Sequence, residues 1–271
     1  MKFTKMQGLG NDFIVLNYLK GDSKNPNELA RKLCRRNYSV GADSLILVLP
    51  SNKADFRMRI FNSDGSEAET GGNELVAFTK YVFFKKLTRK KKIRIETLAG
   101  ASSAEILDGK IRVNIGEPIL EREKIPMKGS KGGVIDEPLK LDKKTVRITA
   151  VSVGNPHAVV FVDTFNFSIG EVGRQIEEHE KFPNKINVEF IEVINKNEVS
   201  VQQWERGAGI TLSTGTGACA AAVSGVLNKK TERKILVHFI GGDMEVEWAR
   251  DNCLYITGQA EIVFEGEISK I

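Results

Sequence analysis

The chain repeats itself, and this repeat is the feature that most restricts its fold. "GNDFIVL" from residue 10 resembles "GNPHAVVFV" from residue 154, so that Asn11 matches Asn155 at an offset of 144. "GADSLILV" from residue 41 matches "KINVEFIEV" from residue 185 at the same offset. "RIFNSDGSEAETGGNELVAF" then matches "QQWERGAGITLSTGTGACAAAV" at an offset of 143. Three landmarks in one order and at one spacing predict two copies of one structural unit.

Each copy combines strand and helix patterns. An extended β-branched run precedes a helix, which we expect over 25–37 in the first copy and over 169–182 in the second. Further strands, a glycine-rich turn and a second helix follow in both copies, with the second helices starting near 71 and 215. The pattern is typical of an α+β protein with two pseudo-symmetric lobes.

The connection between the lobes is expected over 121–142, which carries Pro, Gly and charged residues without a period. This places the lobes at 1–118 and 119–261. Because the two copies match in order and spacing, the cleft between them is the natural place for a small ligand.

Charge and composition argue against several classes of partner. The net charge of +5 comes largely from "KKLTRKKKIR" at 85–94, and no aromatic residue alternates with those charges to stack bases, so we expect a solvated loop and no nucleic-acid partner. No apolar run approaches the roughly 18 residues of a membrane span, and the first residues do not resemble a signal peptide, so we expect a cytoplasmic protein. The three cysteines are widely spaced and predict neither a disulfide framework nor a metal site.

Glycines precede a helix in both copies, at Gly71 and Gly72 and again at Gly215 and Gly217. Glycine lets the backbone approach a ligand closely, and the free N–H groups of a helix's first turn favour an anion. A lone pair of glycines more often only makes a tight turn. The duplication at matched positions favours a carboxylate-binding role.

Polar side chains accompany the same landmarks. Asparagine offers donors and acceptors without charge, which suits a zwitterion, and arginine can form a bidentate pair with a carboxylate. Each of these residues alone is more often a turn or capping residue, so the prediction depends on their joint placement. The candidates are Asn11, Asn62, Asn73, Asn155, Asn187 and Arg206, with Asp12 and His157 as further polar groups.

Six segments resemble the diaminopimelate epimerases, in the order of that family and over essentially the whole chain: "KMQGLGNDF", "FNSDGSEAE", "VSVGNPHAVVFVD", "HEKFPNKINVEF", "WERGAG" and "GTGACAAA". The resemblance implies two lobes, each a mixed sheet wrapped around a central helix, with 262–271 returning to the first lobe. It also implies an isomerase that interconverts LL- and meso-diaminopimelate for lysine biosynthesis, without a cofactor or a metal. It adds Ser44, Gly72, Gly215 and Thr216 to the expected ligand-binding residues.

The family's two catalytic cysteines have no counterpart here. They act as thiolate and thiol on opposite faces of the substrate, and the resemblance places them at Gly71 and Thr214. Glycine cannot titrate, and a threonine hydroxyl is too weak an acid without an activating base. The nearby Glu74 is either an ordinary partner of the helix start or a new base, and Ser213 and His157 are further candidates.

We therefore expect a diaminopimelate epimerase scaffold that lacks both catalytic thiols. The leading hypothesis is an engineered or repurposed active-site variant with negligible epimerase activity. One alternative is a non-catalytic amino-acid-binding homologue, and another is an epimerase with an unforeseen base pair. All three have a small amino-acid-like ligand and no metal or cofactor, and pairing of two copies into a homodimer stays open.

Overall fold

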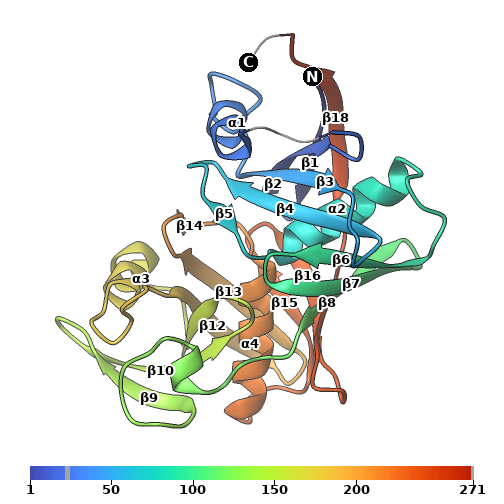
Figure 1. The fold of residues 1–271 in the computed structure, drawn as a ribbon. Coiled ribbons are helices and arrows are strands. Elements are labelled where there is room, and N and C mark those ends of the chain that lie inside the picture. The colour runs from blue at the N-terminus through green and yellow to red at the C-terminus, as the bar shows by residue number, and fades with distance from the viewer. Residues whose placement is uncertain (22–24, 270–271) are drawn as a thin grey trace. The chain divides into compact units, whose positions relative to one another are not determined.

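The computed structural model describes residues 1–21 and 25–269, which form two compact units. Unit 1 comprises Met1–Asn114 together with the C-terminal residues from Thr257 onward, and unit 2 comprises Ile115–Ile256. Residues 270 and 271, part of the segment expected to return to the first lobe, lie outside the described residues. Both units combine a mixed sheet with helices, so the expected α+β class is confirmed (Figure 1).

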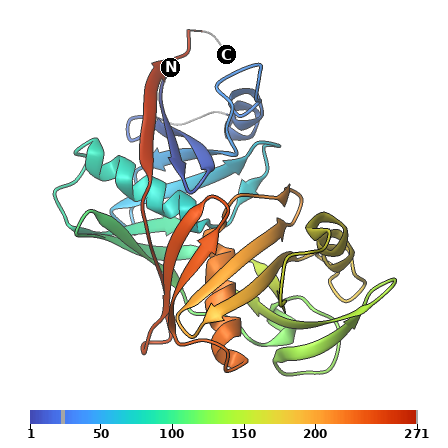
Figure 2. The ribbon, with the colours of Figure 1, turned by 180° about the vertical axis from the view of Figure 1, so that it is seen from behind.

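Unit 1 surrounds one long helix with strands. Its helices are α1 (Pro26–Leu33) and α2 (Gly72–Phe84). Its strands are β1 (Lys2–Gly8), β2 (Asn11–Asn17), β3 (Ser44–Leu49), β4 (Phe56–Asn62), β5 (Glu67–Ala68), β6 (Lys92–Thr97), β7 (Gly100–Leu107), β8 (Lys110–Gly116) and β18 (Glu261–Glu267). Strand β1 pairs antiparallel with β2 and with β18, the red strand beside the N-terminus in Figure 2, whereas β2 pairs parallel with β3.

Unit 2 repeats this arrangement. Its helices are α3 (Ile169–Glu177), α4 (Gly215–Leu227) and the short η1 (Arg122–Lys124). Its strands are β9 (Val134–Lys140), β10 (Thr145–Ser152), β11 (Pro156–Phe161), β12 (Asn187–Asn195), β13 (Glu198–Glu205), β14 (Gly209–Ile210), β15 (Lys234–Phe239), β16 (Gly242–Trp248) and β17 (Leu254–Gly258). Strands β11 and β12 are parallel, and β12 and β13 are antiparallel.

Both central helices are buried because they are apolar nearly all round. In α2 the buried residues include Leu75, Phe78 and Val82, and the helix packs against β1, β2, β3, β7 and β18. In α4 every residue from Gly215 to Gly225 is buried, and the helix packs against β10 to β13, β15 and β16. A helix without a polar face is stable only inside a shell of other elements, and each sheet supplies that shell.

The pairing of strands corrects one part of the predicted repeat. Phe13 lies opposite Ser44 where β2 meets β3, and His157 lies opposite Asn187 where β11 meets β12. If β2 matches β11 at an offset of 144, then Ser44 matches Asn187 at an offset of 143. The predicted alignment of the segments from 41 and 185 is therefore wrong by one residue, a slip that would turn each side chain to the opposite face.

The stretch 121–142 is not the plain connection that its composition predicts. It contains η1 and β9, and β9 pairs antiparallel with β10 inside unit 2. Buried Ile125, Met127, Val134, Leu139 and Leu141 join the core of this unit. Glycines and charged residues separate these apolar residues, so their spacing shows no strand or helix period. For this reason the composition of the stretch predicts a linker.

The two amphipathic helices end earlier than expected. Helix α1 stops at Leu33 with Cys34 as its C-cap residue, and Asn37, which the sequence placed in the helix, lies in the following turn with a left-handed φ of 68°. Helix α3 stops at Glu177, and Phe182 precedes Pro183, a position that disfavours helical backbone.

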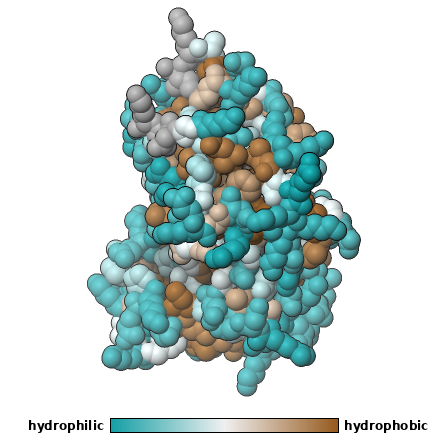
Figure 3. Space-filling view, turned by 45° about the vertical axis from the view of Figure 1, so that its right-hand side comes forward, coloured by the Kyte–Doolittle hydropathy of each residue, from teal (hydrophilic) through white to brown (hydrophobic). Residues whose placement is uncertain are grey.

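Polar side chains cover much of the surface. The face drawn in Figure 3 is largely hydrophilic, with hydrophobic atoms in separate patches. The basic run at 85–94 forms the loop between α2 and β6 and the first residues of β6, and most of its lysines are exposed. Among the residues that the structure describes, no helix is long and apolar enough to cross a membrane.

Candidate functional site

The start of α2 places a carboxylate where the side chain of residue 71 would be. Gly71 is the N-cap residue, with φ −161° and ψ 133°, an extended conformation that any residue adopts. A Cβ built on Gly71 would lie 2.5 Å from Cδ of Glu74 and closer still to Oε2. The backbone thus does not require glycine at this position. The half-buried Glu74 side chain takes the space instead.

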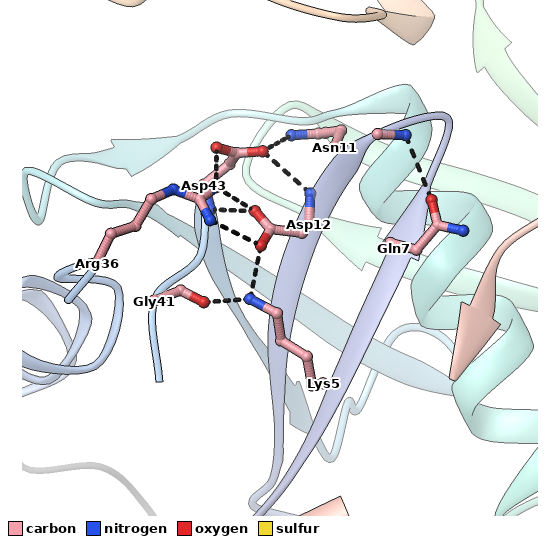
Figure 4. Close-up of polar contacts among 8 residues, drawn as sticks. Lys5, Gln7, Asn11, Asp12, Arg36, Gly41 and Asp43 are labelled. Atoms are coloured by element: carbon pink, nitrogen blue, oxygen red, sulfur yellow. Dashed lines mark hydrogen bonds and ion pairs between the residues drawn. The ribbon is translucent and has the colours of Figure 1, made fainter. Parts of the chain in front are cut away.

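A charged cluster holds Asn11 and Asp12 at the start of β2 (Figure 4). Asn11 Nδ2 donates to Oδ2 of Asp43 at 2.8 Å, and the backbone N–H of Asp12 donates to the same atom at 3.0 Å. Arg36 bridges Asp12 and Asp43, and Lys5 Nζ lies 2.6 Å from Asp12 Oδ2. Partial burial opposes ionisation of Asp12, but the hydrogen bonds from Arg36 and Lys5 outweigh it and lower its pKa from 3.8 to about 2. Asn11 is therefore oriented by Asp43, which Arg36 links to the ionised Asp12.

Ser44 and Asn62 lie side by side at the same end of this sheet, because they are partners in the β3 and β4 pairing. Asn62 is exposed, and its Nδ2 donates to Ser66 Oγ at 3.0 Å, which closes the turn after β4. Ser44 Oγ is buried and has no hydrogen-bond partner among the described residues. A buried hydroxyl without a partner costs about 1–3 kcal/mol, so a ligand atom at this position would relieve a real penalty. Asn73 is buried in the first turn of α2.

The start of α4 is the counterpart of this site in unit 2. Thr214 is the N-cap residue, with φ −148° and ψ 127°, and its Oγ1 accepts from the backbone N–H of Gly217 at 3.4 Å. Thr214 Oγ1 also lies 3.4 Å from Oγ1 of Thr216, which receives a 3.4 Å bond from Nδ2 of Asn155. Neither Gly217 N–H nor the Thr216 hydroxyl is a base. These contacts therefore do not activate Thr214.

His157 lies behind Asn155, fully enclosed. Its Nε2 is 2.7 Å from Oδ1 of Asn155, and its Nδ1 is 2.7 Å from Oε1 of Glu189. Glu189 also rests against the first turn of α4, where a Cβ on Gly217 would lie 2.9 Å from Oε1. The structure thus connects Asn155, His157 and the start of α4, three sequence candidates, through one further residue, Glu189.

Asn187 and Arg206 are also brought together. Asn187 Oδ1 accepts from the backbone N–H of Arg206 at 2.9 Å, and its Nδ2 donates to the carbonyl of Pro156 at 3.0 Å. The side chain of Arg206 is exposed, and Nη1 donates to the carbonyl of Asn184 at 3.2 Å. Asn187 thus secures the turn that carries Arg206, and its contact with a ligand stays a prediction.

A buried glutamate holds the other side of this turn. Glu177 Oε2 accepts from Trp204 Nε1 at 2.7 Å, and Oε1 accepts from the Gly207 N–H at 3.2 Å and from Lys185 Nζ at 3.3 Å. Gly173 of α3 lies so close to Trp204 that a Cβ there would be 2.5 Å from that of the indole side chain. Helix α3 therefore holds the turn that carries Arg206 through the Trp204 side chain before it and the Gly207 N–H after it.

Two of the three cysteines are buried thiols and do not replace those expected at 71 and 214. Burial raises the pKa of Cys34 to about 12 and raises that of Cys219, which lies inside α4. Cys253 is partly exposed in the segment before β17. Among the described residues, no three His, Cys, Asp or Glu side chains form a group that could hold a metal ion.

Sequence reasoning missed the residues that orient the candidates. Asp43 and Arg36 hold Asn11, Glu189 holds His157, and Glu177 holds the turn of Arg206. Glu189 alone left a signal: it lies within a strand whose first five residues are all buried, where a charged side chain needs a partner. Asp43 and Glu177 occur in ordinary polar surroundings and have no comparable signature.

The fold is shared with several solved structures. A probable proline racemase from Agrobacterium radiobacter matches with a TM-score of 0.76 at 16% identity, over 99% of this chain and 92% of that one. A phenazine biosynthesis protein of the PhzF family from Bacillus anthracis matches with a TM-score of 0.70 at 19% identity, over 99% and 98%. At these identities the likeness defines the fold alone.

The sequence defines the family within this fold. The family described as diaminopimelate epimerase matches residues 3–121 and 149–263. Two relatives named diaminopimelate epimerase, from Acetivibrio thermocellus and Methanococcus maripaludis, are each 48% identical over 275 residues and cover 99% of this chain. The match spans 98% and 99% of their own lengths. The chain belongs to the diaminopimelate epimerase family, and the expected resemblance is confirmed.

Proposed function

We propose that this chain is a diaminopimelate epimerase scaffold in which both acid/base thiols are replaced, an engineered or repurposed variant with negligible native epimerase activity. Inversion of an α-carbon needs one group to remove a proton from one face and another to return a proton to the opposite face. Glycine at 71 and threonine at 214 supply neither group. Two relatives that carry the name diaminopimelate epimerase support a small amino-acid-like ligand.

The observation that most supports this proposal is the fit between Gly71 and Glu74. The carboxylate occupies the space of a side chain at 71, so a thiol there and the present position of Glu74 exclude one another. Replacement of the thiol and arrival of the carboxylate are then one coupled change. Random loss of function would not be expected to fill the vacated space with a titratable group.

Glu74 is the proposed base of the altered site. Its carboxylate would take a proton from a carbon more acidic than the α-carbon of an amino acid, and the electron pair would move toward an adjacent carbonyl. The N–H groups at the start of α2 would stabilise the negative charge that develops. Without a matching acid at Thr214, the reaction would return the proton to the same face or to another atom of the substrate.

The test is incubation with LL-diaminopimelate in D₂O, with α-proton loss followed by NMR. The unaltered chain should show no exchange. The Gly71→Cys/Glu74→Gly/Thr214→Cys variant restores both thiols and clears the space for the first, so it should exchange the α-proton and form the meso isomer. Gly71→Cys/Thr214→Cys, which keeps Glu74, is the matched control and should be slower.

Two results would contradict this proposal. Exchange by the unaltered chain would mean that another base pair operates. If the triple variant folds but shows no α-proton exchange, more of the ligand site has changed than the two thiol positions.

A non-catalytic binding protein is the second candidate, and Ser44 favours it. Its buried hydroxyl has no partner among the described residues, which suggests an atom that a ligand would contact. Calorimetric titration with diaminopimelate separates the two candidates. A binding protein should take up the ligand without exchange, whereas a site rebuilt around Glu74 should bind it poorly.

A further inference from the structure

His157 and Glu189 form a couple that is sealed inside unit 2. His157 Nδ1 lies 2.7 Å from Glu189 Oε1, and the two side chains are only 1% and 0% exposed. On the other side of the ring, Nε2 lies 2.7 Å from Oδ1 of Asn155. Because both ring nitrogens have a partner, the number of protons that the couple holds decides which end of the Asn155 amide faces the ring.

The two hydrogen-bond contacts of the His157 ring indicate the number of protons that the couple holds. With two protons the couple is neutral overall, either as carboxylate and imidazolium or as carboxylic acid and imidazole. In both forms Nε2 carries a proton and donates it to Oδ1 of Asn155. With one proton, the ring would direct Nδ1–H to the Glu189 carboxylate and leave a net negative charge in a site closed to water. Oδ1 of Asn155 can only accept, so its contact needs a proton on Nε2, and the contact between Nδ1 and Glu189 Oε1 needs a second proton; the two contacts of 2.7 Å therefore correspond to two protons.

The proton on Nε2 orients Asn155. With its oxygen held by His157, Asn155 directs Nδ2 toward the first turn of α4, where it lies 3.4 Å from Oγ1 of Thr216. An unprotonated Nε2 would accept from Asn155 instead and turn its oxygen toward Thr216. An N–H donor beside a helix N-terminus suits an anionic group, whereas an oxygen would repel it.

We propose that Glu189 is a positioning residue: by keeping a proton on Nε2 of His157, it holds the Asn155 amide with its N–H toward the start of α4, ready for the carboxylate of an amino-acid-like ligand. Glu189 does not touch the ligand itself. The identity of the ligand rests on the proposed function above, but the orientation of Asn155 is a property of the free protein.

Two substitutions at 189 separate positioning from packing. Glu189→Gln keeps the shape and offers an N–H that can donate to Nδ1 of His157, so Nε2 keeps its proton. Glu189→Leu fills the same apolar surroundings but gives Nδ1 no partner, so the single ring proton can sit on either nitrogen. Glu192→Leu, on the same strand β12 but only partly buried, is the matched control.

The first measurement is ¹⁵N NMR of the His157 ring and the Asn155 side-chain amide in ligand-free protein, with His179 and His238 as internal references. The unaltered chain and Glu189→Gln should show Nε2 protonated and one set of Asn155 amide resonances. Glu189→Leu should shift Nε2 toward the unprotonated range and move the Asn155 resonances. Affinity for diaminopimelate should then fall about tenfold in Glu189→Leu and stay within about twofold in Glu189→Gln, as for loss of a group that orients a binding side chain.

The inference is overturned if Nε2 is unprotonated in the unaltered chain, a result that needs no variant and so does not depend on whether Glu189→Leu folds. It is also overturned if Glu189→Leu leaves the His157 and Asn155 resonances unchanged, or if Glu189→Gln alters them as much as Glu189→Leu does. Failure of the unaltered chain to bind diaminopimelate would count only against the second candidate, the non-catalytic binding protein, because the ring and amide resonances that test the role of Glu189 are read without ligand.

Discussion

Gly71 and Thr214 are the N-cap residues of two thirteen-residue helices, and both hold the same extended backbone conformation. The resemblance assigns the two thiols of the family to these positions. An N-cap side chain lies beside the free N–H groups of the helix's first turn. A reacting group mounted there would lie next to the part of the helix that stabilises negative charge.

Gly71 and Glu74 should behave as a coupled pair. Gly71→Cys alone forces the Glu74 carboxylate out of its present place, whereas Glu74→Gly alone only empties that space. The effects of the two changes on the free energy of unfolding should therefore not add, with a coupling of about 0.5–3 kcal/mol in favour of the double variant. Urea unfolding of the unaltered chain, the two single variants and the double variant measures this coupling. Additive effects would show that the Glu74 side chain moves aside without cost.

Thr214 should stabilise α4 as a cap. Thr214→Ala removes the hydroxyl that accepts from the Gly217 N–H, at an expected cost of about 1 kcal/mol. Thr214→Ser keeps an acceptor and should recover most of that stability in the same urea titration. Equal stability of the alanine and serine variants would mean that the 3.4 Å bond contributes nothing.

Asp12 should make stability depend on pH in the acid range. Its pKa is about 2 in the folded protein against an ordinary 3.8, so the ionised group stabilises the fold above about pH 4, and this contribution disappears as the pH falls toward 2. Asp12→Asn should therefore cost roughly 2 kcal/mol at pH 7. The difference in the free energy of unfolding between Asp12→Asn and the unaltered chain should become smaller below pH 4.

The control for Asp12 is Asp108→Asn, because Asp108 is exposed and has a φ of 47° that asparagine readily adopts. Unfolding of both variants is followed from pH 7 to pH 2. A difference for Asp12→Asn that persists unchanged at pH 2 would mean that the cluster stabilises the fold through shape and not through charge.

Glu177 should contribute more to the stability of the fold than its neighbour Glu178. Glu177→Ala leaves the partly buried Trp204 indole N–H and the Gly207 N–H without their acceptor, at a cost of about 1–3 kcal/mol, and it frees the turn that carries Arg206. Glu178 is exposed and pairs only with Lys185 among the described residues, so Glu178→Ala should cost less than about 0.5 kcal/mol. Thermal unfolding compares the two, and equal losses would contradict the role given to Glu177.

The repeat and the glycine turns were sufficient to predict the α+β class and the two long helices. They succeeded because α2 and α4 are strongly apolar and begin at matched turns. The alignment of β3 with β12 failed by one residue because consecutive apolar residues in a fully buried strand have no alternation to fix the register. The stretch 121–142 failed for a related reason, since its few core residues are scattered among glycines and charges.

The candidate site was predictable in its members but not in its connections. The sequence indicates Asn155, His157 and Thr214 separately, whereas the structure connects Asn155 directly to His157 and, through the Thr216 hydroxyl, to Thr214. Glu189 joins them from another strand, 32 residues after His157, and such a contact is set by the pairing of β11 with β12. The direction of the Glu74 side chain likewise depends on its rotamer and on the free space beside it, and neither can be predicted from the residue type alone.

The N-cap setting of positions 71 and 214 bears on how such proteins diversify. Extended backbone accepts almost any side chain, and a helix start tolerates glycine and threonine with little loss of stability. Lineages built on this scaffold can thus exchange one chemical group for another while the architecture that surrounds it is inherited intact. The capacity of this scaffold to change its chemistry thus lies at two backbone positions whose extended conformation does not depend on one residue type.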